Sequence, residues 1–145
     1  MKSIIILLLI GVSLSYNPTA AVVYARKYCK NYNKEYPKFN GDCSNFVSQC
    51  MNAGGENFLD CPHVRNIKGK GIFGSVSTLR TCLTIHGWKN SNTVPRQFRA
   101  GFPMFKGNMH AIIATEVNGN SIKYCGHTSD VCDRELKGDY IYYYK

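Results

Sequence analysis

The stretch Gly41-Asp42-Cys43-Ser44-Asn45-Phe46-Val47-Ser48-Gln49-Cys50-Met51 decides how the rest of the chain is interpreted. Its apolar residues recur at i, i+3, i+4, i+7 and i+8, which is one face of an α-helix: Cys43, Phe46, Val47, Cys50 and Met51. Asp42 is a residue type favoured at helix N-caps, and the pair Gly54-Gly55 is a stop signal. The pattern therefore predicts a helix from Asp42 to Gly54, with Cys43 in its first turn.

A cysteine in the first turn of a helix is a candidate nucleophile. Unpaired backbone N–H groups and the helix dipole favour the thiolate there, which lowers the thiol pKa. The competing interpretation is that Cys43 is half of a disulfide, as is common in secreted chains. The backbone N–H of Cys43 would be the first donor to an oxyanion, and the other oxyanion or helix-cap candidates are Asp42, Tyr36 and Asn40.

The N-terminal segment has the layout of a secretory signal peptide. Lys2 precedes the apolar run Ile4–Ile10, and small residues follow at Ser13 and Ser15. A membrane-spanning helix needs ~20 apolar residues, about twice the length of this run. We therefore expect residues 1–15 to be removed and residues 16–145 to form one secreted domain, outside the cell or in the lumen of a secretory or lysosomal compartment.

Six cysteines besides Cys43 are disulfide candidates: Cys29, Cys50, Cys61, Cys82, Cys125 and Cys132. With seven cysteines in all, at least one thiol stays unpaired. A local bridge between Cys125 and Cys132 is plausible, because a turn-rich segment joins them. No C-x-x-C and no histidine pair at ligand spacing is present, so no metal site is predicted.

The remaining pattern indicates helices first and strands second. A helix beginning at Asn17-Pro18 and ending near Asn31 is followed by a loop over 31–41. Residues 56–74 indicate an ordered surface excursion held by Cys61, and Ser75 or Ser77 begins a third helix that stops at Gly87-Trp88. The expected strands are Phe102–Phe105, His110–Val117, Ser121–Thr128 and Tyr140–Tyr144. This order predicts an α+β fold with an antiparallel sheet.

Asn118-Gly119 is typical of a two-residue type I′ hairpin turn. With that turn Val117 faces Asn120, and His110 lies directly opposite His127 with Cβ atoms ~5 Å apart, unless a bulge at Gly126 shifts the register. Together with Cys43 this pair predicts a Cys-His-His triad. In that triad His110 is the base and His127 orients it. His63 and His86 have no such partner and are assigned to the surface.

These residues resemble a known family, the putative amidase domain best known from spore-forming bacteria, which is similar in fold to papain-like and NlpC-type cell-wall peptidases. The resemblance rests on five segments: Tyr16-Asn17-Pro18, Tyr36-Pro37-Lys38-Phe39, Gly41–Cys50, His110–Thr115 and His127–Asp130. It implies a nucleophile at Cys43, a base at His110, a polar third residue at His127, and amide hydrolysis with no cofactor. The family usually has Thr where Ser44 stands, and a Gly-Asp pair where this chain has Ala100-Gly101-Phe102.

The net charge is +9 at pH 7, of which Lys2 in the signal peptide supplies one unit. Such a surface favours anionic partners, and cell-wall polymers suit a secreted amidase. We therefore expect a monomeric cysteine amidase or peptidase that hydrolyses peptidoglycan stem peptides through an acyl-enzyme, with no nucleic-acid partner and no transmembrane segment.

Two other functions fit the same sequence. A secreted basic ribonuclease would use His110 and His127, with Lys123 nearby, for acid-base cleavage of RNA. A catalytically inactive, cationic wall-binding protein would use exposed tyrosines such as Tyr142–Tyr144.

Overall fold

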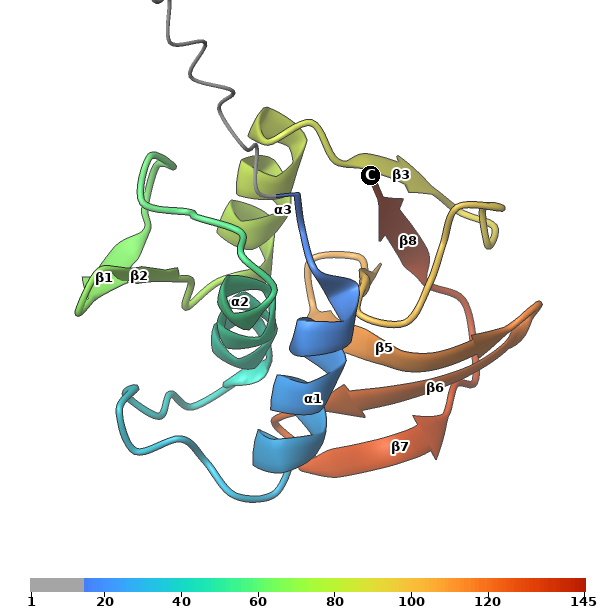
Figure 1. Ribbon diagram of the computed structural model, residues 1–145, viewed down its shortest axis with the longest axis horizontal. Helices are drawn as coiled ribbons and strands as arrows, with labels where there is room; N and C mark the ends of the chain where they lie inside the picture. The colour runs from blue at the N-terminus through green and yellow to red at the C-terminus, as the bar shows by residue number, and fades with distance from the viewer. Residues whose placement is uncertain (1–14) are drawn as a thin grey trace, which may run out of the picture.

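The computed structural model describes residues 15–145, so the predicted signal peptide, residues 1–15, lies outside the described residues except for Ser15. Helices and strands follow one another in this order (Figure 1): α1 Pro18–Tyr28, α2 Cys43–Ala53, β1 Arg65–Ile67, β2 Lys70–Ile72, α3 Val76–Ile85, β3 Lys89–Ser91, β4 Pro103–Lys106, β5 His110–Asn118, β6 Ser121–Gly126, β7 Val131–Glu135 and β8 Ile141–Tyr144. In the described part of the chain, no helix is long and apolar enough to cross a membrane.

The helices pack on an antiparallel sheet, which confirms the predicted α+β fold. Six strands form this sheet in the order β3-β8-β4-β5-β6-β7, and β1 and β2 form a separate hairpin. Helix α2 lies at the centre, in contact with α1, α3, the β1–β2 hairpin and β5 (Figure 1). The main core therefore surrounds α2 and the middle of the sheet.

Helix α2 has the predicted bounds, with Asp42 at the N-cap and Gly54 at the C-cap. Every residue from Cys43 to Asn52 is buried, including polar ones such as Asn45. The carboxylate of Asp42 does not cap the helix; it accepts hydrogen bonds from the Phe39 N–H and the Asn45 side chain instead. It therefore ties the preceding loop to the start of α2.

The β5–β6 hairpin differs from the predicted one. Asn118 pairs with Ser121 and Val117 with Ile122, so the turn residues are Gly119 and Asn120. Gly119 has a positive φ of 59° whereas Asn120 does not, which fits a type II′ turn with glycine first. A bulge between Ala114 and Glu116 shifts the register again. The predicted pairing of His110 with His127 is therefore wrong. In the β5–β6 pair the bulge lies on β5, whereas the irregularity next to Gly126 belongs to the β6–β7 pair.

Some elements were missed or misplaced. The first helix ends at Tyr28, short of the predicted Asn31. Residues 56–74 contain the short strands β1 and β2, and the sheet also includes β3 and β7. Three of these four strands have only three residues each and are largely polar, so they carry no period-2 pattern that a sequence could reveal.

Two disulfides cross-link the domain. Cys29 pairs with Cys132, which joins the end of α1 to β7, and Cys61 pairs with Cys82 on α3. The predicted Cys125–Cys132 bridge is therefore wrong. Cys50 and Cys125 are free thiols and are buried, like Cys43.

Gly101 packs so closely against α1 that there is no room for a side chain. Its φ is +92°, and a Cβ atom there would lie 2.3 Å from the backbone oxygen of Pro18. We expect Gly101→Ala to lower the free energy of unfolding by ~2 kcal/mol or more, because α1 would have to move off the sheet.

Gly107 is the matched control: its φ is +54° and nothing lies within 4 Å of its Cβ position. Gly107→Ala should cost only ~1 kcal/mol of backbone strain. Urea denaturation of both variants measures the difference, and equal losses would contradict the close approach of α1.

Candidate active site

Cys43 and His110 come from different elements and meet where α2 packs on β5. Cys43 is the first residue of α2, and His110 is the first residue of β5, following the turn Gly107-Asn108-Met109. The guanidinium of Arg80 on α3 donates to Gly107 O and Asn108 Oδ1, both at 3.0 Å. Helix α3 therefore holds the turn that places His110.

The surroundings of Cys43 favour its thiolate. Burial raises the pKa of this thiol, but hydrogen bonds from the His110 side chain and the Ala111 N–H lower it, and so does the charge of His110. The Ser44 hydroxyl, 4.0 Å from Cys43 Sγ, also lowers the pKa of the Cys43 thiol. The net pKa lies below that of an ordinary thiol, as the position at the start of α2 predicts.

Alkylation by iodoacetamide should report this pKa directly. We expect the rate at Cys43 to rise with pH along a curve whose midpoint lies below the ~8.5 of a free cysteine, because the thiolate is the reacting form. His110→Ala should move the midpoint upward. Cys50 and Cys125 are internal controls, because burial raises the pKa of both thiols. Mass spectrometry of the alkylated peptides follows all three sites, and faster labelling of Cys50 than of Cys43 would contradict the assignment.

His127 does not contact His110 in the way the sequence predicted. Its Nδ1 lies 2.5 Å from Asp42 Oδ2, and its Nε2 lies 2.8 Å from the backbone oxygen of Tyr28. The ring is stacked between those of Tyr32 and Phe46, with both centroids at 3.9 Å. Both ring nitrogens are thus engaged by residues other than His110.

The hydrogen bonds of His127 and Asp42 link the two side chains to the surrounding backbone. The carbonyl of Tyr28 only accepts, so Nε2 of His127 carries a proton. Hydrogen bonds from His127, Phe39 and Asn45 lower the pKa of Asp42 despite the opposing effect of its burial, so its carboxylate is ionised and also only accepts. Nδ1 of His127 faces this carboxylate, so the two side chains form a buried salt bridge, with exposed fractions of 1% and 2%. Asp42 immediately precedes Cys43, the first residue of α2.

The other residues predicted for the site, Tyr36 and Asn40, come from the loop before α2. Asn40 is exposed in the loop before α2. Tyr36 closes a turn through its N–H to Asn33 O and lines a small hollow with Ile67 and Lys68. Neither forms a hydrogen bond with Cys43 among the described residues. The backbone N–H of Cys43, at the first position of α2, has no hydrogen-bond partner in that part of the chain and is free to donate.

A hollow of about 370 Å³ lies beside the loop that leads to Cys43. It is lined by Phe39, His63, Arg65, Gly74, Ser75 and Thr78. The Arg65 guanidinium stands 5.0 Å from the centre of the Phe39 ring, and the N–H of Phe39 donates to Asp42. A larger hollow of about 440 Å³, lined partly by Glu56, lies at the far end of α2 and contains neither Cys43 nor His110. The hollow at Phe39 is not lined by Cys43 or His110 either, but Phe39 lies only four residues before Cys43 in the chain.

Sequence reasoning placed His86 on the surface without a partner, and this is wrong. Its Nδ1 lies 3.1 Å from Glu56 Oε2 and its Nε2 2.8 Å from Asp60 Oδ1. Burial lowers the pKa of His86, but the two carboxylates outweigh it and raise the pKa. The nearest sequence signal was the spacing of Cys82 and His86, one helical turn apart, whereas Glu56 and Asp60 come from a segment without periodicity.

The fold defines the class of protein: it is an α+β domain that carries a thiol at the start of α2 and an imidazole at the start of β5. The chain belongs to the putative amidase domain family, whose model matches residues 15–144. This membership confirms the family that the sequence motifs indicated.

The chain is also 42% identical over 102 residues to the uncharacterized protein YhbB of Bacillus subtilis (strain 168). The match covers 70% of this chain but 29% of that protein, so the chain spans less than a third of its relative. No solved structure matches the chain. The two disulfides are typical of proteins in oxidising compartments such as the extracellular space.

Proposed function

We propose that this protein is a secreted cysteine amidase or peptidase that hydrolyses amide bonds in peptidoglycan stem peptides. The observation that carries the proposal is the position of the buried Cys43 at the start of α2, near His110 at the start of β5, which together with the Ala111 N–H lowers the pKa of the thiol. Membership of an amidase family supplies the bond type.

In the first step the Cys43 thiolate attacks the amide carbonyl, and the new C–S bond leaves a negative charge on the carbonyl oxygen. The free backbone N–H of Cys43 at the start of α2 would donate to that oxygen. His110, protonated by the thiol, then gives its proton to the amine, which leaves as the C–N bond breaks. The products of this step are a thioester and a free amine.

In the second step water hydrolyses the thioester. His110 is neutral after protonating the amine, so it accepts a proton from the attacking water. The C–S bond breaks, the acid is released, and the proton held by His110 pairs again with the Cys43 thiolate. Nothing in this cycle requires a redox partner.

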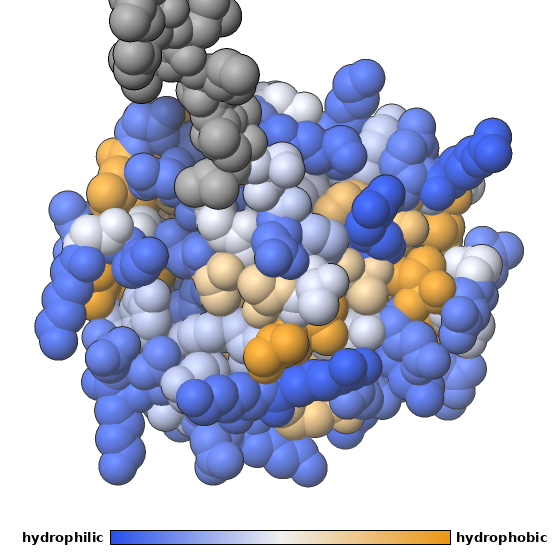
Figure 2. All heavy atoms as spheres, in the orientation of Figure 1, coloured by the Kyte–Doolittle hydropathy of each residue, from blue (hydrophilic) through white to orange (hydrophobic). Residues whose placement is uncertain are grey.

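The substrate class is supported by charge. The net charge of +9 favours an anionic polymer, and Arg65 lines the hollow beside the loop that precedes Cys43. Stem peptides offer carboxylates that such a hollow would attract. Figure 2 shows one face as mostly hydrophilic, with hydrophobic side chains in small separate groups, which suits a polar wall better than a lipid surface.

The alternatives lose their main support. A ribonuclease would need His110 and His127 together, but the ring nitrogens of His127 bind Asp42 and Tyr28. A tyrosine binding face would need Tyr142 and Tyr143 exposed, but they are 7% and 2% exposed. In this proposal His127 is a positioning residue, because it acts through Asp42 on the start of α2.

Digestion of purified peptidoglycan tests the substrate. We expect peptides to be released from intact glycan strands, with new amine and carboxyl ends in equal number, as mass spectrometry of the soluble fragments would show. The oxidised secreted protein is used, with Cys43→Ala as the blank. Released sugars without released peptides would contradict the proposal, and so would equal release by the blank.

A further inference from the structure

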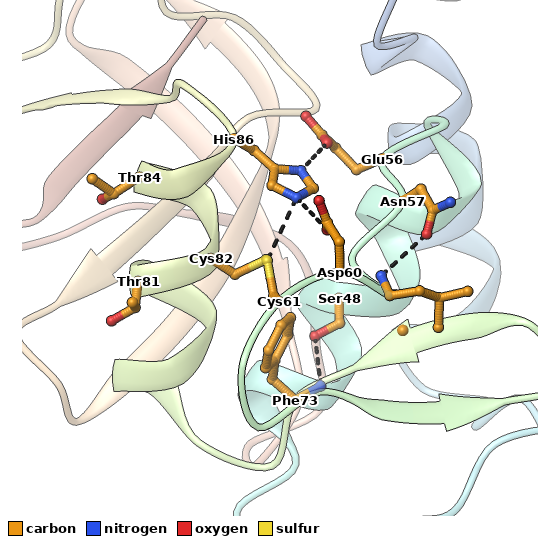
Figure 3. The surroundings of a disulfide bond; sticks show 12 residues. Ser48, Glu56, Asn57, Asp60, Cys61, Phe73, Thr81, Cys82, Thr84 and His86 are labelled. Carbon is orange, nitrogen blue, oxygen red and sulfur yellow. Dashed lines mark hydrogen bonds and ion pairs between the residues drawn. A yellow bond between two sulfur atoms is a disulfide. The ribbon is translucent and has the colours of Figure 1, made fainter.

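A second cluster of reactive side chains lies away from Cys43, at the other end of α2. Figure 3 shows His86 directed between the carboxylates of Glu56 and Asp60, beside the Cys61–Cys82 disulfide. Nε2 of His86 is 3.5 Å from Cys61 Sγ and 2.8 Å from Asp60 Oδ1. The side chain of His86 is 13% exposed and that of Asp60 is 71% exposed, so the cluster opens to solvent on the Asp60 side.

We propose that, once the Cys61–Cys82 disulfide is reduced, these residues form a site for Zn²⁺. Three ligand atoms already lie together, Cys61 Sγ, Cys82 Sγ and His86 Nε2. Asp60 Oδ1, which is 2.8 Å from His86 Nε2 but outside that group, supplies the fourth ligand by moving toward the sulfurs. This inference is independent of the amidase proposal, because no residue of the Cys43 site takes part.

The donor set and its spacing suit tetrahedral zinc. Zn–S bonds of about 2.3 Å and Zn–N bonds of about 2.0 Å place a sulfur and a nitrogen ligand about 3.5 Å apart at the tetrahedral angle. Cys61 Sγ and His86 Nε2 already stand 3.5 Å apart. The ligand atoms of Cys61, Cys82 and His86 all lie within 4.8 Å of one another. Cys82 and His86 are one helical turn apart at the end of α3, a spacing that directs two ligands to one side.

The remaining nitrogen of His86 has the support that zinc-bound histidines usually have. Nδ1 lies 3.1 Å from Glu56 Oε2, so a carboxylate fixes the ring and leaves Nε2 directed at the sulfur. Glu56 is itself fixed, because its Oε1 accepts from Trp88 Nε1 at 2.6 Å and from Lys145 Nζ at 3.3 Å. The orientation of the histidine ligand is therefore set before any metal arrives.

The chemistry balances with a thiol reductant. Two equivalents of a thiol, or one of a dithiol, reduce the disulfide to two cysteine thiols and are oxidised to their own disulfide. Zn²⁺ then binds both sulfurs as thiolates and His86 Nε2 as a neutral donor, so it displaces the two thiol protons and the proton that Nε2 shares with Asp60. In either state the segment that carries Asp60 and Cys61 stays fastened to the end of α3, by a disulfide when oxidised and by a metal when reduced.

Metal titration of the reduced protein tests this site. The full-length secreted protein carries Cys43→Ser, because this substitution removes the nucleophilic thiol from competition. It is reduced with a phosphine and titrated with Co²⁺ as the optical probe, and then with Zn²⁺. We expect one Co²⁺ per chain, with the intense visible bands of a tetrahedral site and thiolate charge-transfer bands, and full displacement by Zn²⁺. Glu56→Gln should weaken the Zn²⁺ affinity ~10- to 100-fold, and His86→Ala should weaken it more.

Cys29→Ser is the matched control, because Cys29, Cys125 and Cys132 form a second group of close sulfurs without a histidine. Once both disulfides are reduced, this variant removes one thiol from that group and leaves the proposed site complete, so its titration should be unchanged. Loss of binding in Cys29→Ser, an unchanged spectrum in Cys61→Ser, or equal metal uptake by the oxidised protein would each overturn the proposal. Failure of Zn²⁺ to bind or refold a reduced chain that circular dichroism shows to be unfolded would do the same.

Discussion

Cys43→Ala should reduce peptide release from peptidoglycan by on the order of 10⁴-fold or more, because it removes the atom that forms the covalent intermediate. His110→Ala should cause a loss of similar order, since neither the thiol nor the leaving amine then has a proton partner. Both residues act in one step, so the double variant should be hardly worse than either single one. Initial rates of amine release, measured for the four proteins at equal folded concentration, give this comparison.

Cys50→Ala is the control for this loss. Cys50 lies two turns further along α2 and is fully buried, and burial raises the pKa of its thiol. Its replacement removes one buried sulfur and should cost ~1–2 kcal/mol of stability without changing the rate per folded molecule. If Cys50→Ala abolished amine release while Cys43→Ala retained it, the nucleophile would be misassigned.

The sequence was informative where a pattern was local. The face of α2, its ends at Asp42 and Gly54 and the separation of helices from strands could all be predicted, because helix periodicity and glycine stop signals act within a few residues. The family motif around Cys43 identified the amidase family for the same reason.

Relations between distant residues were harder to predict. One bulge between Ala114 and Glu116 and a hairpin turn one residue later than expected removed the predicted pairing of His110 with His127. Composition could not distinguish Cys29–Cys132 from the shorter Cys125–Cys132 bridge, since the true pair is 103 residues apart. The bond between Asp42 and His127 spans 85 residues, and nothing in either segment indicates it.

His127→Ala should lower the free energy of unfolding by ~3–5 kcal/mol, the range seen when one partner of a buried ion pair is removed. The loss has two physical sources: the buried carboxylate of Asp42 is left without its cation, and the space between the rings of Tyr32 and Phe46 is emptied. Urea denaturation at neutral pH measures it. His63→Ala is the control, because His63 is exposed and should change stability by less than ~0.5 kcal/mol.

A double-mutant cycle separates the ion pair from the ring packing. Asp42→Asn should destabilise the native chain more than it destabilises His127→Ala, with a coupling of ~1–3 kcal/mol. The folded pKa of Asp42 lies below its unfolded value, so its contribution is complete above the unfolded pKa of ~3.9 and is lost as pH falls through the folded pKa. The coupling should therefore shrink on acidification below about pH 4.

A coupling near zero at neutral pH would show that packing alone explains the role of His127. A full coupling, accompanied by an upward shift in the alkylation midpoint of Cys43, would show that the ion pair positions the start of α2.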